Sequence, residues 1–142
     1  MKKILLLVAA LLFSAASVFS QTYVVSVSWE HNECNCLDQG NSYYGVKVVI
    51  QDVANDMVVV EGKEVKVDFG TYTVDVSVPE VLAQCEDQTL QFPPNFKVMV
   101  GVAVICDYTI PPESICNAYQ SHNYTCSDFA DGNVNFTDLQ FE

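Results

Sequence analysis

Six cysteines are the residues of this 142-residue chain with the most definite chemistry. An even number of thiols supports either a disulfide framework or a metal centre. A bridge between Cys34 and Cys36 is disfavoured, because it would close a very small strained ring. We therefore expect three disulfides in which these two cysteines have different partners, pinning their segment to the C-terminal third of the chain. The six residues are Cys34, Cys36, Cys85, Cys106, Cys116 and Cys126.

The alternative to disulfides is a metal site, in which two histidines would bind the ion together with the thiols. His31 precedes Cys34 by three residues and His122 precedes Cys126 by four, and both spacings suit a metal ligand pair. Zinc sites more often combine Cys-x-x-Cys pairs with defined histidine spacings, and an oxidising compartment consumes thiols as disulfides. The sequence therefore favours disulfides, with both histidines at the surface.

Oxygen ligands alternate in the stretch 131–139, DGNVNFTDL, near the end of the chain. This stretch resembles the second half of the calcium loop of cellulosomal dockerins. The resemblance implies a sharp turn at Gly132 and a set of oxygen ligands typical of such a loop. The implied ligands are the side chains of Asp131, Asn135 and Asp138 and the backbone carbonyl of Asn133.

The first half of the loop departs from that pattern. Ser127 and Phe129 would occupy its two early ligand positions, and phenylalanine has no oxygen in its side chain. Dockerins also require a second loop, which this sequence lacks. The alternative interpretation is an Asp-Gly turn that leads into a terminal strand, so no metal site or cofactor is favoured.

Carbohydrate binding and catalysis receive less support. Trp29, Tyr43 and Tyr44 offer aromatic rings for a sugar, although large aromatic residues on alternating strands usually belong to the core. The chain has no arginine, no nucleophile elbow, no HExxH motif and no phosphate-binding glycine loop. The sequence therefore predicts a non-enzymatic protein, with a calcium-binding or carbohydrate-binding module as the alternative function.

Residues 1–20 have the three parts of a signal peptide. Two lysines precede an unbroken apolar run from Ile4 to Phe13, which is followed by mostly small residues. A membrane anchor needs about 20 predominantly apolar residues, and this run is shorter. We expect cleavage after Ser20, or alternatively after Ala16, and hence a secreted, extracellular or cell-surface protein without stable membrane insertion.

Removal of this leader makes an acidic chain more acidic. The net charge of the whole sequence is −12, and the loss of two of its six lysines leaves four lysines against 18 acids, a net charge of −14. Such a field repels nucleic acid and anionic membranes. The remaining segment, 21–142, has the length of one domain.

Alternation of apolar and polar residues predicts half-buried strands along this segment. It covers Tyr23 to Trp29, Tyr44 to Ile50 and Met57 to Glu61, and Gly62-Lys63 then suggests a two-residue hairpin turn. The parity of the apolar positions changes at Gly70, which must therefore be a turn or a bulge.

The second half of the chain is expected to be less regular. Glu80 to Asp87, after Pro79, is the only helix that we predict. Phe96 to Cys106 is apolar on both faces, which indicates a central strand covered on each side or one that meets another subunit. The alternation is lost from Asp107 to Asp131 and returns in a last strand within 133–142.

Five to seven strands over this length predict an all-β protein, namely an antiparallel β-sandwich of immunoglobulin-like size with an irregular, cysteine-rich C-terminal region. The Cys, Trp, Cys order of immunoglobulin domains is absent, because Trp29 precedes Cys34. We expect a structural or interaction role, with other copies of the chain or another surface protein as partner through β-strand addition. Asn123 and Asn135 begin glycosylation sequons, which matter only in a eukaryotic source.

Overall fold

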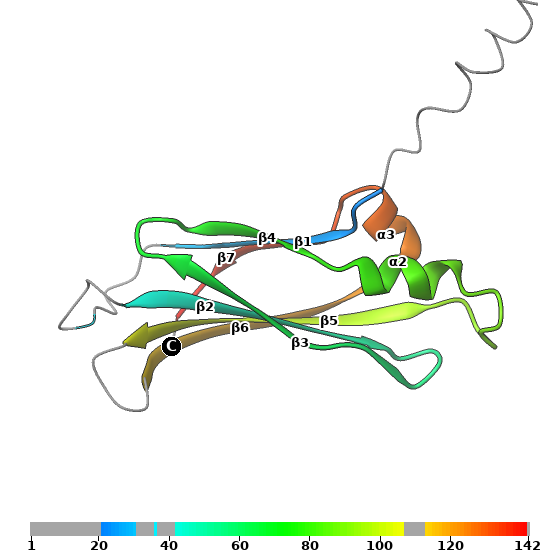
Figure 1. The fold of residues 1–142 in the computed structure, drawn as a ribbon, viewed down its shortest axis with the longest axis horizontal. Helices are drawn as coiled ribbons and strands as arrows, with labels where there is room; N and C mark the ends of the chain where they lie inside the picture. Colours follow the sequence, from blue (N-terminus) through cyan, green and yellow to red (C-terminus); the bar gives the residue numbers. More distant parts are fainter. Residues whose placement is uncertain (1–20, 31–35, 37–41, 107–112, 142) are drawn as a thin grey trace, which may run out of the picture.

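The computed structural model describes residues 21–30, 36, 42–106 and 113–141, which form two β-sheets (Figure 1). The predicted leader lies outside the described residues. The three-stranded sheet has the order β4-β1-β7 and the four-stranded sheet the order β3-β2-β5-β6. The prediction of a mostly β fold is confirmed. The strands are β1 (Val24–Trp29), β2 (Tyr43–Asp52), β3 (Met57–Asp68), β4 (Thr73–Ser77), β5 (Asn95–Cys106), β6 (Glu113–Thr125) and β7 (Asn135–Leu139).

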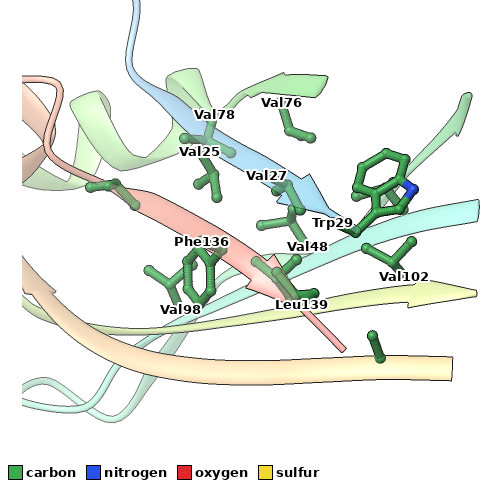
Figure 2. Packing of buried hydrophobic residues seen from close by; sticks show 14 of the residues in the cluster. Val25, Val27, Trp29, Val48, Val76, Val78, Val98, Val102, Phe136 and Leu139 are labelled. Atoms are coloured by element: carbon green, nitrogen blue, oxygen red, sulfur yellow. The ribbon is translucent and has the colours of Figure 1, made fainter. Parts of the chain in front are cut away.

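The apolar core lies between the two sheets and follows the predicted alternation. Alternate residues from Tyr23, just before β1, to Trp29 are buried, as are alternate residues of β2 from Tyr44 to Ile50. Even-numbered residues of β5 contribute a third buried row. Figure 2 shows Val25 and Val27 of β1 above Phe136 of β7, with Val98 of β5 next to the Phe136 ring.

Gly70 forms a turn that takes the chain from one sheet to the other. Its φ angle is +94°, a conformation that glycine adopts without steric penalty. The preceding strand β3 belongs to the four-stranded sheet and the following strand β4 to the three-stranded sheet. The parity change read from the sequence therefore marks a change of sheet.

The predicted hairpin turn at Gly62-Lys63 is wrong. Strand β3 runs unbroken through these residues, and the β2–β3 turn lies earlier, at 53–56. The register between β2 and β3 shifts twice, once beside Val49 and once between Ile50 and Gln51, because β3 carries extra residues there. The glycine therefore lies in a β-bulge, the other structure that an isolated glycine in a strand pattern signals.

The prediction of an irregular region before residue 131 is also wrong over the described residues. Strand β6 pairs with β5 from Asn95↔Thr125 to Cys106↔Glu113, with one shift beside Val104. A second helix, α3 (Cys126–Ala130), follows β6 directly. The Thr125 side chain accepts a hydrogen bond from the Asp128 backbone, and the Asp128 side chain accepts one from the Thr125 backbone, which closes a capping box.

The predicted helix and the predicted last strand are both present. Helix α2 (Pro79–Glu86) begins at Pro79 and buries Val81, and Figure 1 shows α2 and α3 near the same end of the sheets. Strand β7 pairs with β1 in parallel, and a register shift lies opposite Ser28. The fold is therefore antiparallel except at this one described pair.

Candidate interaction surfaces

The aromatic residues predicted as a sugar platform do not share a surface. Trp29 and Tyr44 are each only 4% exposed, and their rings meet edge to face at 5.2 Å in the core. Burial raises the pKa of the Tyr44 phenol, and the Tyr72 phenol raises it further. Tyr43 lies on the other face of β2, where the Lys66 ammonium is 4.0 Å from its ring centroid. Neighbouring strand residues point to opposite sides, so these three rings cannot bind one sugar.

The residues of the calcium hypothesis are spread over a turn and a strand. Asn135 and Asp138 lie in β7, where the Asn135 side-chain amide donates to the Gly132 carbonyl at 3.5 Å and Asp138 has a φ angle of +57°. Asp131 follows α3, and Gly132 turns the chain with a φ angle of +70°. The geometry corresponds to the Asp-Gly turn.

Two disulfides connect distant parts of the described chain. Cys36 is bonded to Cys106 and Cys85 to Cys126. Cys116 is also disulfide-bonded, whereas Cys34 lies outside the described residues. The first bridge ties the Cys-Asn-Cys segment to the end of β5, and the second ties α2 to the start of α3.

These disulfides remove cysteines that the alternative metal site would need as ligands. Cys126, the partner expected for His122, is held in a disulfide, as is Cys36. His122 is exposed, as predicted, with its ring centroid 5.4 Å from that of Phe136. Within the described part of the chain, no group of three or more His, Cys, Asp and Glu residues is placed to hold a metal ion.

Asp52, the last residue of β2, is a fully buried carboxylate that organises one end of the molecule. Its Oδ1 accepts hydrogen bonds from the backbone N–H groups of Ala54 at 3.2 Å and Asn95 at 3.1 Å. Its Oδ2 accepts from the side-chain amides of Asn55 at 2.7 Å and Gln84 at 2.9 Å. This single carboxylate therefore joins the β2–β3 turn, helix α2 and the start of β5.

The protonation state of Asp52 suits a structural role. Burial acts to raise its pKa, but the hydrogen bonds from Gln84, Asn55, Asn95 and Ala54 outweigh burial and hold the pKa below its ordinary value. The group is thus ionised at neutral pH and fully hydrogen-bonded. A general acid or base needs a pKa near the working pH and access to substrate. Asp52 has neither, and its hydrogen bonds instead hold the turn, α2 and β5 together.

The turn that Asp52 supports displays an apolar surface, here called the hairpin-tip patch. Four of the five most exposed large hydrophobic residues of the described chain lie there, each between 44% and 60% exposed: Val53, Met57, Val58 and Phe92. Asn55 fixes Phe92 with two hydrogen bonds, since its Nδ2 donates to the Phe92 carbonyl at 3.0 Å and its Oδ1 accepts from the Phe92 N–H at 3.1 Å. Clustered exposed apolar side chains mark an interaction site.

The outer face of the four-stranded sheet carries a shallow groove of about 320 Å³. Small residues form its floor, where Gly45 lies opposite Ala103 and Lys47 lies opposite Gly101. Tyr119 of β6, 63% exposed, borders the groove. The outer residues of β5 are half-buried from Met99 to Ile105, so the predicted burial of both faces is complete only on the inner face.

Positive charge is concentrated on this outer face. Three of the four lysines that follow residue 20 belong to it, because Lys47, Lys66 and Lys97 alternate with inward-facing residues of their strands. The fourth, Lys63, donates to the Ser77 carbonyl at 2.6 Å and lies 3.5 Å from the Glu80 carboxylate. The same face also carries two carboxylates, Glu64 opposite Lys47 and Asp68 opposite Tyr43, so its charge is mixed.

Strand β6 forms one edge of the same sheet and is unusual in its composition. It has no Asp, Glu, Lys or Arg between Ser114 and Thr125. Over 118–124 its backbone hydrogen-bonds to β5 alone among the described residues, and no described strand pairs with its other side. An open strand edge is a template for another strand.

The sequence analysis did not predict the hairpin-tip patch or the β6 edge, although the sequence held a partial signal for each. The hairpin-tip patch depended on the β2–β3 turn, and Asp52 followed by Asn55 is a turn composition that the glycine at 62 obscured. Thr125 and Asp128 have the spacing of a capping box, which marks the start of α3 and hence the end of β6. The polar inner side of β6 gave no signal of its own.

A scan against protein-family models finds no match for this chain, and searches of curated proteins and of solved structures find none either. No helix of the described residues has the length and hydrophobicity needed to cross a membrane. The surfaces described above are therefore the basis for a function.

Proposed function

We propose that this chain is a secreted or cell-surface protein with a non-enzymatic structural or interaction role. In this proposal it is a disulfide-stabilised β-sandwich of immunoglobulin-like size that assembles by β-strand addition, with copies of itself or with another surface protein. The two disulfides support an oxidising compartment. The shared core of a three-stranded and a four-stranded sheet supports the sandwich.

The observation that carries the proposal is the uncharged open edge of β6. Natural β proteins protect their edges with charges, bulges or short strands, and the other edges here have such protection. An edge that remains long and open in a chain of net charge −12 is suited to accept a strand.

Sedimentation velocity on residues 21–142 with intact disulfides tests the self-association half of this proposal. We expect assemblies whose population grows between micromolar and millimolar protein, and electron microscopy would show their form. If the protein sediments as a monomer at every concentration, self-assembly fails and only binding to a different surface protein remains.

The exported state has its own measurement. We expect the N-terminal sequence of the protein recovered from outside the cell to begin at Gln21. Recovery of the full-length chain in the cytosol, with reduced cysteines, would contradict the secretion part of the proposal.

A further inference from the structure

We infer that the partner of the β6 edge is the β6 edge of a second copy, paired antiparallel about a two-fold axis to form a closed dimer. This inference rests on the proposed function and specifies its partner and geometry. The two four-stranded sheets would become one continuous sheet across both copies, and the site on each copy is Ala118 to Tyr124 of β6.

The first step of the argument is the state of the backbone. In an antiparallel ladder, each strand directs the N–H and C=O groups of alternate residues to one neighbour and those of the remaining residues to the other side. The β5 side of β6 is paired continuously from Ala118 to Thr125. On the other side, the backbone of 118–124 has no hydrogen bond to any described residue. These groups are therefore available for a new strand.

The second step is charge, which argues for β6 over the other edges. Two copies of a chain with a net charge of −12 repel each other wherever carboxylates meet. Each of the other three edge strands has at least one carboxylate, and β3 has three, whereas the one carboxylate of β6, Glu113, lies outside 118–124. The carboxylates are Glu61, Glu64 and Asp68 in β3, Asp75 in β4 and Asp138 in β7. Contact along 118–124 places no carboxylate opposite another.

The third step is geometry. Strands β4 and β7 have five residues each, β7 departs from regular register at Asp138, whose φ angle is +57°, and β3 has two bulges. Strand β6 has 13 residues, and its register with β5 is regular from Cys116 to Thr125. A regular strand can present a straight row of hydrogen-bonding groups to its own copy, and identical edges are self-complementary about a two-fold axis.

The fourth step is the side chains that the pairing would cover. Tyr119 is the most exposed large hydrophobic residue described, and it lies on the outer face of β6 beside Ser121 along the strand. In an antiparallel pair, residues of the same face from the two strands lie opposite each other. Pairing would thus place the Tyr119 ring against the outer side chains of the other copy, where it loses contact with water.

Assembly by this geometry stops at two copies. After β6 meets β6, the ends of the joined sheet are the two β3 strands, whose charges and bulges oppose further pairing. The inference therefore predicts a dimer rather than a fibre.

A charged residue on the β6 edge tests the inference. We expect residues 21–142 to dimerise by sedimentation equilibrium, and Ser121→Glu to weaken the dimer at least tenfold because two carboxylates would meet near the axis. Thr73→Glu is the matched control, since it adds the same charge to the exposed face of edge strand β4 and should leave the dimer unchanged. Thermal unfolding of both variants checks that they remain folded.

Hydrogen exchange on the unaltered protein gives a second measurement that needs no variant. We expect alternate amides within 118–124 to slow as protein concentration rises, while amides of 61–68 in β3 stay constant. Dimers that resist Ser121→Glu, protection that appears elsewhere, or open fibres would overturn the inference and leave the proposed function standing. A strict monomer would overturn both the inference and self-assembly.

Discussion

The two edges of the four-stranded sheet, β3 and β6, are of nearly equal length but are treated in opposite ways by the sequence. Strand β3 has 12 residues with five charged side chains and two bulges. Strand β6 has 13 residues, and no charge occurs between Ser114 and Thr125. The two edges of one sheet therefore differ both in the charge of their side chains and in the regularity of their backbone pairing.

This difference shows where each strand obtains its stability. The inner side of β6 packs against the other sheet, since Phe136 of β7 lies 5.4 Å from His122 and 5.9 Å from Tyr124, measured between ring centroids. The Tyr124 hydroxyl also donates to the Asn135 carbonyl at 3.2 Å. Strand β3 instead begins at the turn held by Asp52 and pairs with β2 alone within its sheet.

The largest effect is expected from Phe136→Ala, which tests the packing of β7 against the inner side of β6. Phe136 is fully buried against β6, and loss of a buried phenylalanine ring costs about 3–5 kcal/mol of unfolding free energy because of the cavity that remains. Urea unfolding measures the loss. Thr137→Ala, the exposed neighbour in β7, should change the value by less than about 0.5 kcal/mol. Equal effects of the two substitutions would mean that β7 does not support β6.

The next effect concerns the disulfide at the end of β6. Replacement of both Cys85 and Cys126 by serine should cost about 2–4 kcal/mol, since the bridge closes a long loop in the unfolded chain. The control pair Ala83→Ser and Ser127→Ala alters exposed neighbours and should stay within about 0.5 kcal/mol of the original protein. Chemical denaturation without reductant compares them, and an unchanged midpoint for the serine pair would contradict the role of the bridge.

At the end of β2, Asp52→Asn should cost about 1–3 kcal/mol at neutral pH, because an amide cannot accept all four hydrogen bonds. The pKa of Asp52 is lower in the folded protein than its ordinary value of 3.8. The carboxylate thus stabilises the fold above that value, and this stabilisation is lost as the pH falls through the folded pKa.

The difference between Asp52→Asn and the original protein should therefore shrink below about pH 4, which unfolding curves measured across pH would reveal. Asp56→Asn is the control, because Asp56 is exposed and asparagine tolerates its positive φ angle of 52°. A pH-independent difference for Asp52→Asn would show that the carboxylate is not the source of the effect.

The smallest change in stability, and the sharpest test of the two edges, comes from removing the carboxylates of β3. The substitutions Glu61→Thr, Glu64→Thr and Asp68→Thr should each change the unfolding free energy by about 0.5 kcal/mol or less. We expect these substitutions to open the β3 edge, so that light scattering detects species larger than the dimer. A control with the same charge loss elsewhere should not associate further: Asp56→Asn, Glu86→Gln and Asp131→Asn.

Elements with one buried and one polar face could be read from the sequence. The alternation from Tyr23 to Trp29 and from Tyr44 to Ile50 matches burial residue by residue, because each strand packs one face on the core. The parity change at Gly70 identified a turn. The change of sheet at this turn required the tertiary structure.

Strand β6 and the β3 bulge could not be read in this way. The inner positions of β6 include Ala118, Gln120 and His122, which are too polar or too small to produce an alternating pattern. Gly62 is a turn signal when only neighbouring residues are considered, and the pairing of β3 with β2 makes it part of a bulge. Both sites were hidden because distant strands, and not local residues, determine them.

The parallel pairing of β7 with β1 has a consequence for the order of events during folding. Val27, in the middle strand of the three-stranded sheet, lies opposite Phe136, which is far away in the sequence. A ribosome-bound chain that lacks residues 135–139 cannot complete this sheet, and contacts between such distant segments form slowly. The edge of β1 that pairs with β7 therefore stays open until nearly the whole chain has been synthesised.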